Sequence, residues 1–193
     1  TKKYFYSNFF YENDLKNLLA TITIISIYKD IKKLDKNIFY DHKAINGRGD
    51  IIKVKLFKKD FYLVDESYNS NPLSLKSALK NFDSIKVDSS KKHLVLGDML
   101  ELGKYSKKLH IEIGNFINKT SLKNVNVIGE YIKWAFNNVN KSRRGIILNK
   151  RSQIIDLIKN NLNNNDYLMI KGSNSTGLNS LTNLIKTGNT HAL

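Results

Sequence analysis

The spacing of apolar residues changes along the chain and divides it into two parts. Over residues 12–28, leucine and isoleucine recur every three or four positions, which predicts a helix. A second, shorter helix is predicted over residues 34–42. The glycine-punctuated run 46–50 (NGRGD) then breaks the pattern, as a linker does. We therefore predict a domain boundary at this run, with residues 1–46 in one domain and residues 47–193 in the next.

Beyond the break, short strands alternate with helices. Residues 51–57 (IIKVKLF) alternate apolar and basic side chains, which predicts a half-exposed strand, and residues 61–64 are predicted to form a second strand after a turn at Lys58–Asp60. Further short apolar strands are predicted at 93–96, 125–128, 145–148 and 167–170. The helices between and after these strands are predicted at 73–82, 105–118, 130–137, 151–162 and 177–186.

This alternation predicts an α/β domain. Short, almost wholly apolar strands are typical of a parallel sheet that is buried on both faces. Regular β-α alternation implies right-handed crossovers and a Rossmann-like, doubly wound, mostly parallel sheet. Ligands of such sheets bind beyond the C-terminal ends of the strands. Candidate binding and catalytic residues are therefore expected in the loops that follow the predicted strands.

The net charge of +15, from 32 Lys and Arg against 17 Asp and Glu, raises the question of a nucleic-acid partner. The basic residues are dispersed, mostly as pairs at the ends of predicted elements. This distribution favours a solvated surface, and we expect no nucleic-acid partner. A positive cleft would still favour a ligand that carries phosphate groups.

Several classes of protein are disfavoured by what the sequence lacks. It has no cysteine, and therefore no disulfide or thiolate metal site. It has no apolar run of about 18 residues, so no membrane span is expected. The N-terminus lacks the features of a signal peptide. The four histidines are scattered without metal-ligand spacing, and we predict no metal ligand in the chain. These features together favour a cytoplasmic location.

The first candidate loop is residues 65–72 (DESYNSNP), which follow a predicted strand. Asn71 and Pro72 suit the N-cap and first position of a helix. A capped turn alone does not explain two carboxylates directly after a buried strand. Carboxylates at a strand tip can accept hydrogen bonds from ribose hydroxyls. Binding and a purely structural turn both remain open for this loop.

Two further loops follow predicted strands. In residues 97–103 (GDMLELG), Asp98 and Glu101 are interpreted either as acid–base residues or, preferably, as residues that cap and order the loop. Residues 171–177 (KGSNSTG) open the last helix, where backbone amides and hydroxyl groups favour an anion. The alternative for this third loop is a flexible polar cap. No Gly-x-x-x-x-Gly-Lys-Ser/Thr phosphate-binding loop occurs in the sequence.

Taken together, these loops resemble the C-terminal domain of the Mur ligases, in the MurF branch that adds D-alanyl-D-alanine to a UDP-N-acetylmuramoyl-tripeptide. The family's Gly-Arg-Gly matches residues 47–49, and its Asp-Asp/Glu-Ser-Tyr-Asn-Ala-Asn-Pro matches residues 65–72, with Ser70 in place of Ala. Its Gly-Asp-Met-x-Glu-Leu-Gly matches residues 97–103, and its Lys-Gly-Ser matches residues 171–173. The resemblance covers about residues 11–187.

The resemblance implies an ATP-dependent amide ligase. ATP and Mg²⁺ activate the C-terminal carboxylate of the UDP-linked muramoyl tripeptide as an acyl phosphate, and the amine of D-alanyl-D-alanine attacks it. The phosphate-binding loop, the Mg²⁺ ligands and a carbamylated lysine are implied to lie on upstream sequence, and residues 1–46 are implied to be the end of a central ATP-binding domain. We accordingly expect no catalytic residue in this chain, no turnover by these 193 residues alone, and a monomeric full-length enzyme.

Site roles also follow from the resemblance. The residues implied to bind the nucleotide are Arg48, Asp65, Glu66, Tyr68 and Asn69. The residues implied to bind the incoming dipeptide are Asn71, Lys171, Ser173, Asn174, Ser175 and Thr176. Asn174 replaces the family's usual Arg, which puts a charge-paired contact at that position in doubt. Asp98 and Glu101 are expected to order their loop.

Two other functions stay open at the level of sequence. One is another Mur-type ligase, similar to folylpolyglutamate or cyanophycin synthetases, which share this kind of domain. The Tyr-Asn-x-Asn-Pro run at residues 68–72 argues against it. The other is a non-enzymatic basic module that binds nucleic acid, whose affinity would depend strongly on salt.

Overall fold

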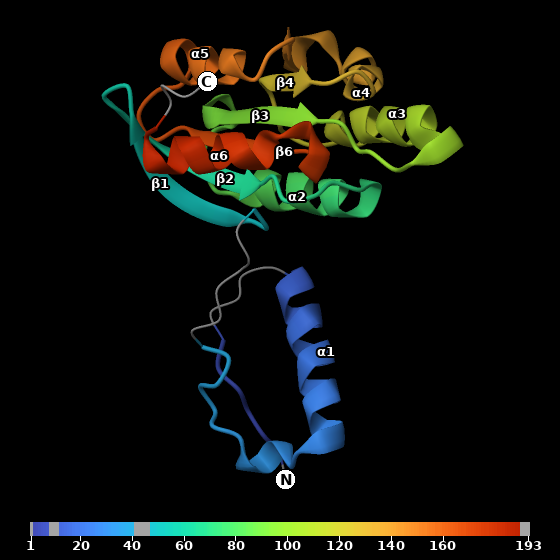
Figure 1. Cartoon of the computed structure of the whole chain (residues 1–193), viewed down its shortest axis with the longest axis vertical. Coiled ribbons are helices and arrows are strands. Elements are labelled where there is room, and N and C mark those ends of the chain that lie inside the picture. The colour runs from blue at the N-terminus through green and yellow to red at the C-terminus, as the bar shows by residue number, and fades with distance from the viewer. Residues whose placement is uncertain (1, 8–11, 41–46, 190–193) are drawn as a thin grey trace. The chain divides into compact units, whose positions relative to one another are not determined.

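The computed structural model describes residues 2–7, 12–40 and 47–189 of the chain (Figure 1). The chain divides into two compact units, residues 1–44 and residues 45–193. The predicted boundary at residue 46 falls among positions outside the described residues. Within the described residues, no helix combines the length and apolar character needed to cross a bilayer.

The first unit contains one long helix, α1 (Glu12–Tyr28), followed by a 3₁₀ turn at Ile31–Lys33. Its small apolar contact is formed by the Phe5 and Phe39 rings, whose centroids lie 5.4 Å apart in an edge-on arrangement. On α1, the side chains of Leu19 and Ile27 stay more than half exposed. The described part of this unit therefore buries little of its own apolar surface.

The predicted helix at 34–42 is wrong for its described part, residues 34–40, which form turns instead; residues 41 and 42 lie outside the described residues. Asp35 favours a turn here, because its Oδ1 accepts a hydrogen bond from the Asn37 amide at 2.7 Å. Asp30 caps the preceding 3₁₀ turn, where its side chain accepts a hydrogen bond from the Lys32 amide. Such local side-chain contacts compete with helix formation.

The second unit is built on a six-stranded sheet with the order β1-β2-β6-β3-β4-β5. Figure 1 shows β1, β2, β6, β3 and β4 side by side in this order. Strand β1 is antiparallel to β2, and all the other neighbouring pairs are parallel. The strands are β1 (Asp50–Leu56), β2 (Lys59–Glu66), β3 (Lys92–Gly97), β4 (Val125–Ile128), β5 (Arg144–Leu148) and β6 (Tyr167–Lys171).

Helices cover both faces of the sheet and form two separate cores. Helices α2 (Pro72–Ser84), α3 (Ser106–Ile117) and α4 (Ile132–Asn138) contribute to the core on one face. Helices α5 (Ser152–Asn161) and α6 (Leu178–Thr187) contribute to the core on the other. This three-layered arrangement confirms the predicted α/β, doubly wound, mostly parallel fold.

The hairpin between β1 and β2 differs in detail from the prediction. Its turn consists of Phe57 and Lys58, both with positive φ (53° and 60°), and not of Lys58–Asp60. Two positive φ angles characterise the two-residue turn whose twist suits a hairpin. Because the turn is shorter than predicted, β2 begins at Lys59 and continues through Glu66. Asp65 and Glu66 are therefore the last residues of a strand and alternate between its two faces.

Candidate functional site

The loops singled out in the sequence leave the same edge of the sheet. Strand β6 lies between β2 and β3, and its last residue, Lys171, is paired with Glu66 on one side and with Leu96 on the other. The C-terminal ends of the three strands are therefore level. The segments that follow them, beginning at residues 67, 98 and 172, start side by side. We call this the carboxyl edge of the sheet.

The segment before β1 reaches the same edge. Gly49 N–H donates to the Asp65 carbonyl at 2.8 Å, and Tyr68 N–H donates to the Gly47 carbonyl at 3.1 Å. Gly47 and Gly49 have φ angles of 80° and 95°, in the region that favours glycine. Between them, the exposed Arg48 guanidinium lies 4.7 Å from the centre of the Tyr68 ring. A cation and an aromatic face are thus presented together at the edge.

Lys171 lies beneath the turn that follows β2. Its Nζ is 2.9 Å from the Asn69 carbonyl and 3.4 Å from Glu66 Oε2, and its side chain is only 2% exposed. Burial lowers the pKa of Lys171, and the neighbouring Glu66 carboxylate opposes that shift. The Glu66 side chain is 19% exposed, so solvent and ligands can reach it. Lys171, predicted to contact the dipeptide, here supports the turn assigned to the nucleotide.

Asp65 is placed differently from its neighbour Glu66. Its side chain is fully buried on the opposite face of the strand. Its Oδ1 accepts hydrogen bonds from the Ser67 amide (3.0 Å) and hydroxyl (2.5 Å). Its Oδ2 lies 2.6 Å from Lys186 Nζ. Both carboxylate oxygens therefore have partners inside the protein, and Glu66, whose side chain is 19% exposed, is the more accessible of the two carboxylates.

The rest of the 65–72 segment forms a capped entry into α2. Asn69 and Tyr68 are exposed, and the Asn69 side chain accepts a hydrogen bond from the Ser70 amide at 2.7 Å. Asn71 caps the helix: its Oδ1 accepts from the Ser74 amide at 2.8 Å, while its own amide donates to the Ser74 hydroxyl. The structural interpretation of Asn71 as a cap is thus correct, and the cap leaves Tyr68 and Asn69 facing outward.

The loop after β6 is anchored by Ser173 and opens outward at its tip. The Ser173 hydroxyl accepts from the Leu100 amide at 2.9 Å and donates to the Ser70 carbonyl at 3.2 Å, which links all three loops. Asn174 and Ser175 are exposed, and Thr176 donates its hydroxyl to the Ser173 carbonyl at 2.6 Å. The tip therefore presents amide and hydroxyl groups without a formal charge.

Asp98 joins the loop after β3 to helix α4. Its carboxylate accepts hydrogen bonds from the Ile132 amide at 2.7 Å and the Glu130 amide at 3.1 Å. Both amides lie at the start of α4, where free N–H groups favour a negative charge. Glu101, in contrast, is exposed with a φ of 62°, and its carboxylate makes no hydrogen bond to another described residue.

His110, on α3, completes the support of this loop. Its ring is fully buried, and its Nε2 accepts from the Met99 amide at 3.2 Å. Its Nδ1 lies 2.8 Å from the Ser106 carbonyl, which accepts only if Nδ1 carries the proton. Burial lowers the pKa of His110, and the neutral ring fits both contacts. His110 is therefore a structural residue.

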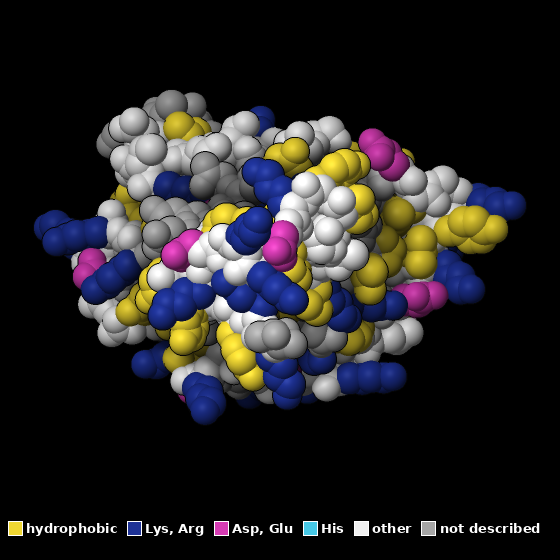
Figure 2. All heavy atoms as spheres, turned by 90° about the horizontal axis from the view of Figure 1, so that it is seen from below, with side chains coloured by type: hydrophobic (Ala, Val, Ile, Leu, Met, Phe, Trp, Pro, Cys, Tyr) yellow, Lys and Arg dark blue, Asp and Glu magenta, His cyan; other side chains and the backbone are white. Residues whose placement is uncertain are grey.

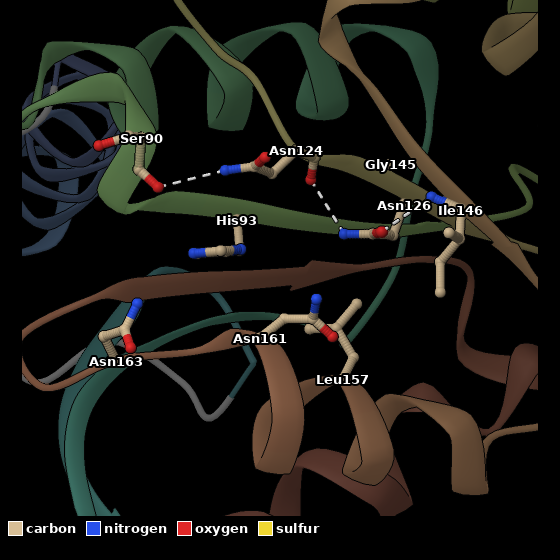
Figure 3. Close-up of a pocket in the computed structure, with 9 residues that line it drawn as sticks. All are labelled: Ser90, His93, Asn124, Asn126, Gly145, Ile146, Leu157, Asn161 and Asn163. Carbon is tan, nitrogen blue, oxygen red and sulfur yellow. Dashed lines mark hydrogen bonds between the residues drawn. The ribbon is translucent and has the colours of Figure 1, made fainter.

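The opposite, amino end of the sheet holds a cavity of about 370 Å³ (Figure 3). Amide side chains line it, but Asn126 is engaged within the protein. Its Nδ2 donates to the Leu94 carbonyl at 3.0 Å, and its Oδ1 accepts from the Ile146 amide at 3.0 Å, where the pairing of β4 with β5 is irregular. His93 also lines the cavity, and its Nε2 lies 3.2 Å from Asp166 Oδ2. These contacts lie within the protein and stabilise the amino end of the sheet.

Figure 2 shows lysine and arginine side chains interspersed with apolar and acidic ones. This matches the dispersed basic pairs of the sequence.

The comparisons with known proteins point to one family. The model of "Mur ligase, glutamate ligase domain" matches residues 47–174. A UDP-N-acetylmuramoyl-tripeptide–D-alanyl-D-alanine ligase of Rickettsia prowazekii is 28% identical over 169 residues, covering 87% of this chain and 35% of that protein. The ligase of the same name from Bacillus subtilis is 30% identical over 128 residues, covering 63% and 28%. The chain thus spans about a third of the length of these relatives.

Solved structures agree on the fold. The MurF ligase from Thermotoga maritima in complex with ADP has a TM-score of 0.74 at 16% identity, over 100% of this chain and 47% of that one. A MurF structure from Acinetobacter baumannii has a TM-score of 0.75 at 19% identity, over 94% and 39%. At these identities the likeness concerns the arrangement of the backbone.

Proposed function

The chain belongs to the Mur ligase family, whose glutamate ligase domain it carries, and on this premise we propose that its carboxyl edge forms one wall of a ligase active site. In the proposed reaction, ATP phosphorylates the C-terminal carboxylate of a UDP-N-acetylmuramoyl-tripeptide and leaves as ADP. The amine of D-alanyl-D-alanine then attacks the acyl phosphate, which forms the amide bond and releases phosphate. The enzyme acts in the cytoplasm as a monomer. Residues 1–46 are, in this proposal, the end of the central ATP-binding domain.

One observation carries the proposal more than any other: Arg48, Tyr68 and Glu66 converge on the edge where the sheet's loops meet. The Arg48 guanidinium lies against the Tyr68 ring, and Glu66 leaves the neighbouring strand with its carboxylate reachable from outside. A guanidinium suits phosphate oxygens, and a carboxylate suits ribose hydroxyls. We assign these three residues and Asn69 to the nucleotide.

The same edge offers a second set of groups for the incoming dipeptide. Asn174, Ser175 and the amides that open α6 lie at the tip of the loop after β6, and this loop is joined to the segment before α2 by the hydrogen bond from Ser173 to the Ser70 carbonyl. These neutral donors can hold a carboxylate by hydrogen bonds. Ser173 and Lys171 are buried and shape this surface from below. We assign the tip, residues 174–176, to the carboxylate end of the dipeptide.

The residues of the carboxyl edge account for only part of the proposed nucleotide binding. Arg48 and Glu66 can hold the ribose and phosphates, but residues 1–193 contain no phosphate-binding loop. In the described part of the chain, no group of three His, Cys, Asp or Glu side chains is arranged to hold a metal ion. We therefore assign Mg²⁺ and the triphosphate mainly to residues outside this sequence. The metal, when bound, would offset the charge of the phosphates.

A chimera tests the proposed function. Residues 47–193 would replace the corresponding C-terminal part of the Bacillus subtilis ligase, and products would be identified by mass spectrometry with ATP, the UDP-linked tripeptide and D-alanyl-D-alanine. The proposal predicts the pentapeptide product from the chimera and none from the 193-residue chain alone.

Substituting glutamate for the dipeptide tests the alternative that the chain comes from another Mur-type ligase. A chimera that accepts glutamate in preference to D-alanyl-D-alanine would contradict the substrate assignment. ATP-dependent ligation by the 193-residue chain alone would contradict the assignment of the phosphate-binding loop to other sequence.

A further inference from the structure

A lysine far along the sequence lies behind the carboxyl edge. Lys186 is on the last helix, α6, and its Nζ lies 2.6 Å from Asp65 Oδ2. Both atoms are buried, and neither has another hydrogen-bond partner among the described residues. Asp65 is fully buried, so the ion pair is shielded from solvent. Removal of one partner from a buried pair leaves an uncompensated charge.

A second carboxylate lies opposite Asp65 in the sheet. In the antiparallel pairing of β1 with β2, Asp50 is the direct cross-strand partner of Asp65. Directly opposed residues project to the same face, and two like charges in these positions repel each other. Asp50 Oδ2 is buried without a hydrogen-bond partner among the described residues. Burial and the Asp65 charge raise the pKa of Asp50, whereas Lys186 opposes this shift.

Asp50, Asp65 and Lys186 lie next to the residues of the candidate site. Asp50 directly follows Gly47–Gly49, and Asp65 directly precedes Glu66. The Asp65 carboxylate also accepts hydrogen bonds from the Ser67 amide and hydroxyl. The Ser67 hydroxyl in turn lies 2.9 Å from Thr182 Oγ1 of α6. Hydrogen bonds from the Gly49 and Tyr68 amides then connect the two segments. The positions of Arg48 and Tyr68 therefore depend on the buried contacts of Asp65 and Ser67.

We propose that Lys186 is a positioning residue, whose ammonium offsets the opposed carboxylates of Asp50 and Asp65 and so holds Arg48 and Glu66 in place for the nucleotide. The effect on nucleotide binding rests on the proposed function. The support of the carboxyl edge by Lys186 does not. It also assigns Asp65, predicted from the sequence to bind the nucleotide, to the support of that site. Lys186 belongs to no motif noted in the sequence.

Hydrogen exchange in the 193-residue chain tests the structural part. In Lys186→Met, which keeps most of the side-chain volume and removes the charge, the Gly49, Ser67 and Tyr68 amides should exchange at least tenfold faster. The amides of β3, such as Leu94, should change less than threefold. Lys186→Arg should restore protection, and Lys80→Met, which removes an exposed lysine on α2, should leave all of these amides unchanged.

Unchanged exchange at Gly49, Ser67 and Tyr68 in Lys186→Met would overturn the proposal. Equal acceleration at these amides and at Leu94 would also overturn it, because that result indicates global destabilisation. The second arm is titration with ADP, where Lys186→Met should bind several-fold more weakly than Lys186→Arg. If the unaltered chain binds no ADP, the proposed nucleotide site fails, while the exchange result still decides whether Lys186 positions the edge.

Discussion

The two ends of the sheet use similar side chains in different ways. At the amino end, His93, Asn124 and Asn126 mostly contact the protein itself, and Asn126 replaces strand contacts that an irregular register leaves out. At the carboxyl edge, buried groups such as Asp65 support exposed ones such as Arg48. A cavity lined with polar groups is therefore not by itself a binding site, because those groups can be engaged within the protein. A surface that displays exposed groups supported by buried, hydrogen-bonded residues is the stronger candidate.

The largest expected difference between the two ends concerns activity in the chimera. Arg48→Ala or Glu66→Gln should lower kcat/KM for ATP by on the order of 10- to 100-fold, since hydrogen bonds to charged groups contribute roughly 1.5–3 kcal/mol. Steady-state assays at varied ATP provide the measurement. The matched change at the amino end, Asn161→Ala, should leave kcat/KM within about twofold. Equal losses at both ends would remove the distinction between them.

The next effect concerns stability and separates two acidic residues of one loop. Asp98→Ala should lower the free energy of unfolding by about 1–3 kcal/mol, because it leaves two amides at the start of α4 without their acceptor. Glu101→Ala, an exposed position, should change it by no more than about 0.5 kcal/mol. Urea denaturation of the 193-residue chain measures both. Comparable losses from the two variants would contradict the role given to Asp98.

A smaller effect, shared by both ends, is the response to acid. Burial lowers the pKa of His110 at the carboxyl edge and of His93 at the amino end, where Asp166 partly offsets the shift. Because the unfolded chain binds these protons more readily, the stability they contribute is complete above a pH of about 6.5 and falls as the pH drops toward the folded pKa values. Denaturation at pH 7.5 and 5.5 should show this fall.

Variants at the two histidines show which end contributes to the acid response. His110→Gln and His93→Gln should each reduce the difference in unfolding free energy between pH 7.5 and pH 5.5. A difference that stays unchanged in both variants would show that other groups cause the acid response.

The smallest effect is expected from the cavity at the amino end. Asn161→Ala and Asn163→Ala should each change the free energy of unfolding by no more than about 0.5 kcal/mol, because neither side chain makes a hydrogen bond to another described residue. Thermal denaturation of the two variants checks this. A loss above 1.5 kcal/mol would mean that the amino end depends on these amides as the carboxyl edge depends on Asp98.

Much of the second unit could be predicted from the sequence, because parallel strands buried on both faces form short apolar runs that are easy to recognise. The hairpin was misplaced because Phe57 and Lys58 adopt positive φ without the Gly or Asn that usually signals such a turn. The predicted helix is wrong over its described part, residues 34–40, because the contact of the Asp35 side chain with the Asn37 amide is not visible in apolar spacing.

The candidate site was only partly predictable. The loops were found because each follows a strand, but Asp65 and Glu66 were given the same role. The alternation of Phe61, Leu63 and Asp65 toward one face would have separated them if the strand had been extended to residue 66. Lys186 offered no local signal, since it is one of 32 basic residues and meets Asp65 only through the tertiary fold.

Titration of the isotope-labelled 193-residue chain with ADP, followed by amide chemical shifts, tests most directly whether the carboxyl edge is the ligand-binding end. We predict shift changes at Arg48 and at residues 66–69, with little change at Asn124, Asn126 and Ile146. Changes centred on the amino-end residues, or none at either end up to millimolar ADP, would contradict the assignment of the carboxyl edge to the nucleotide.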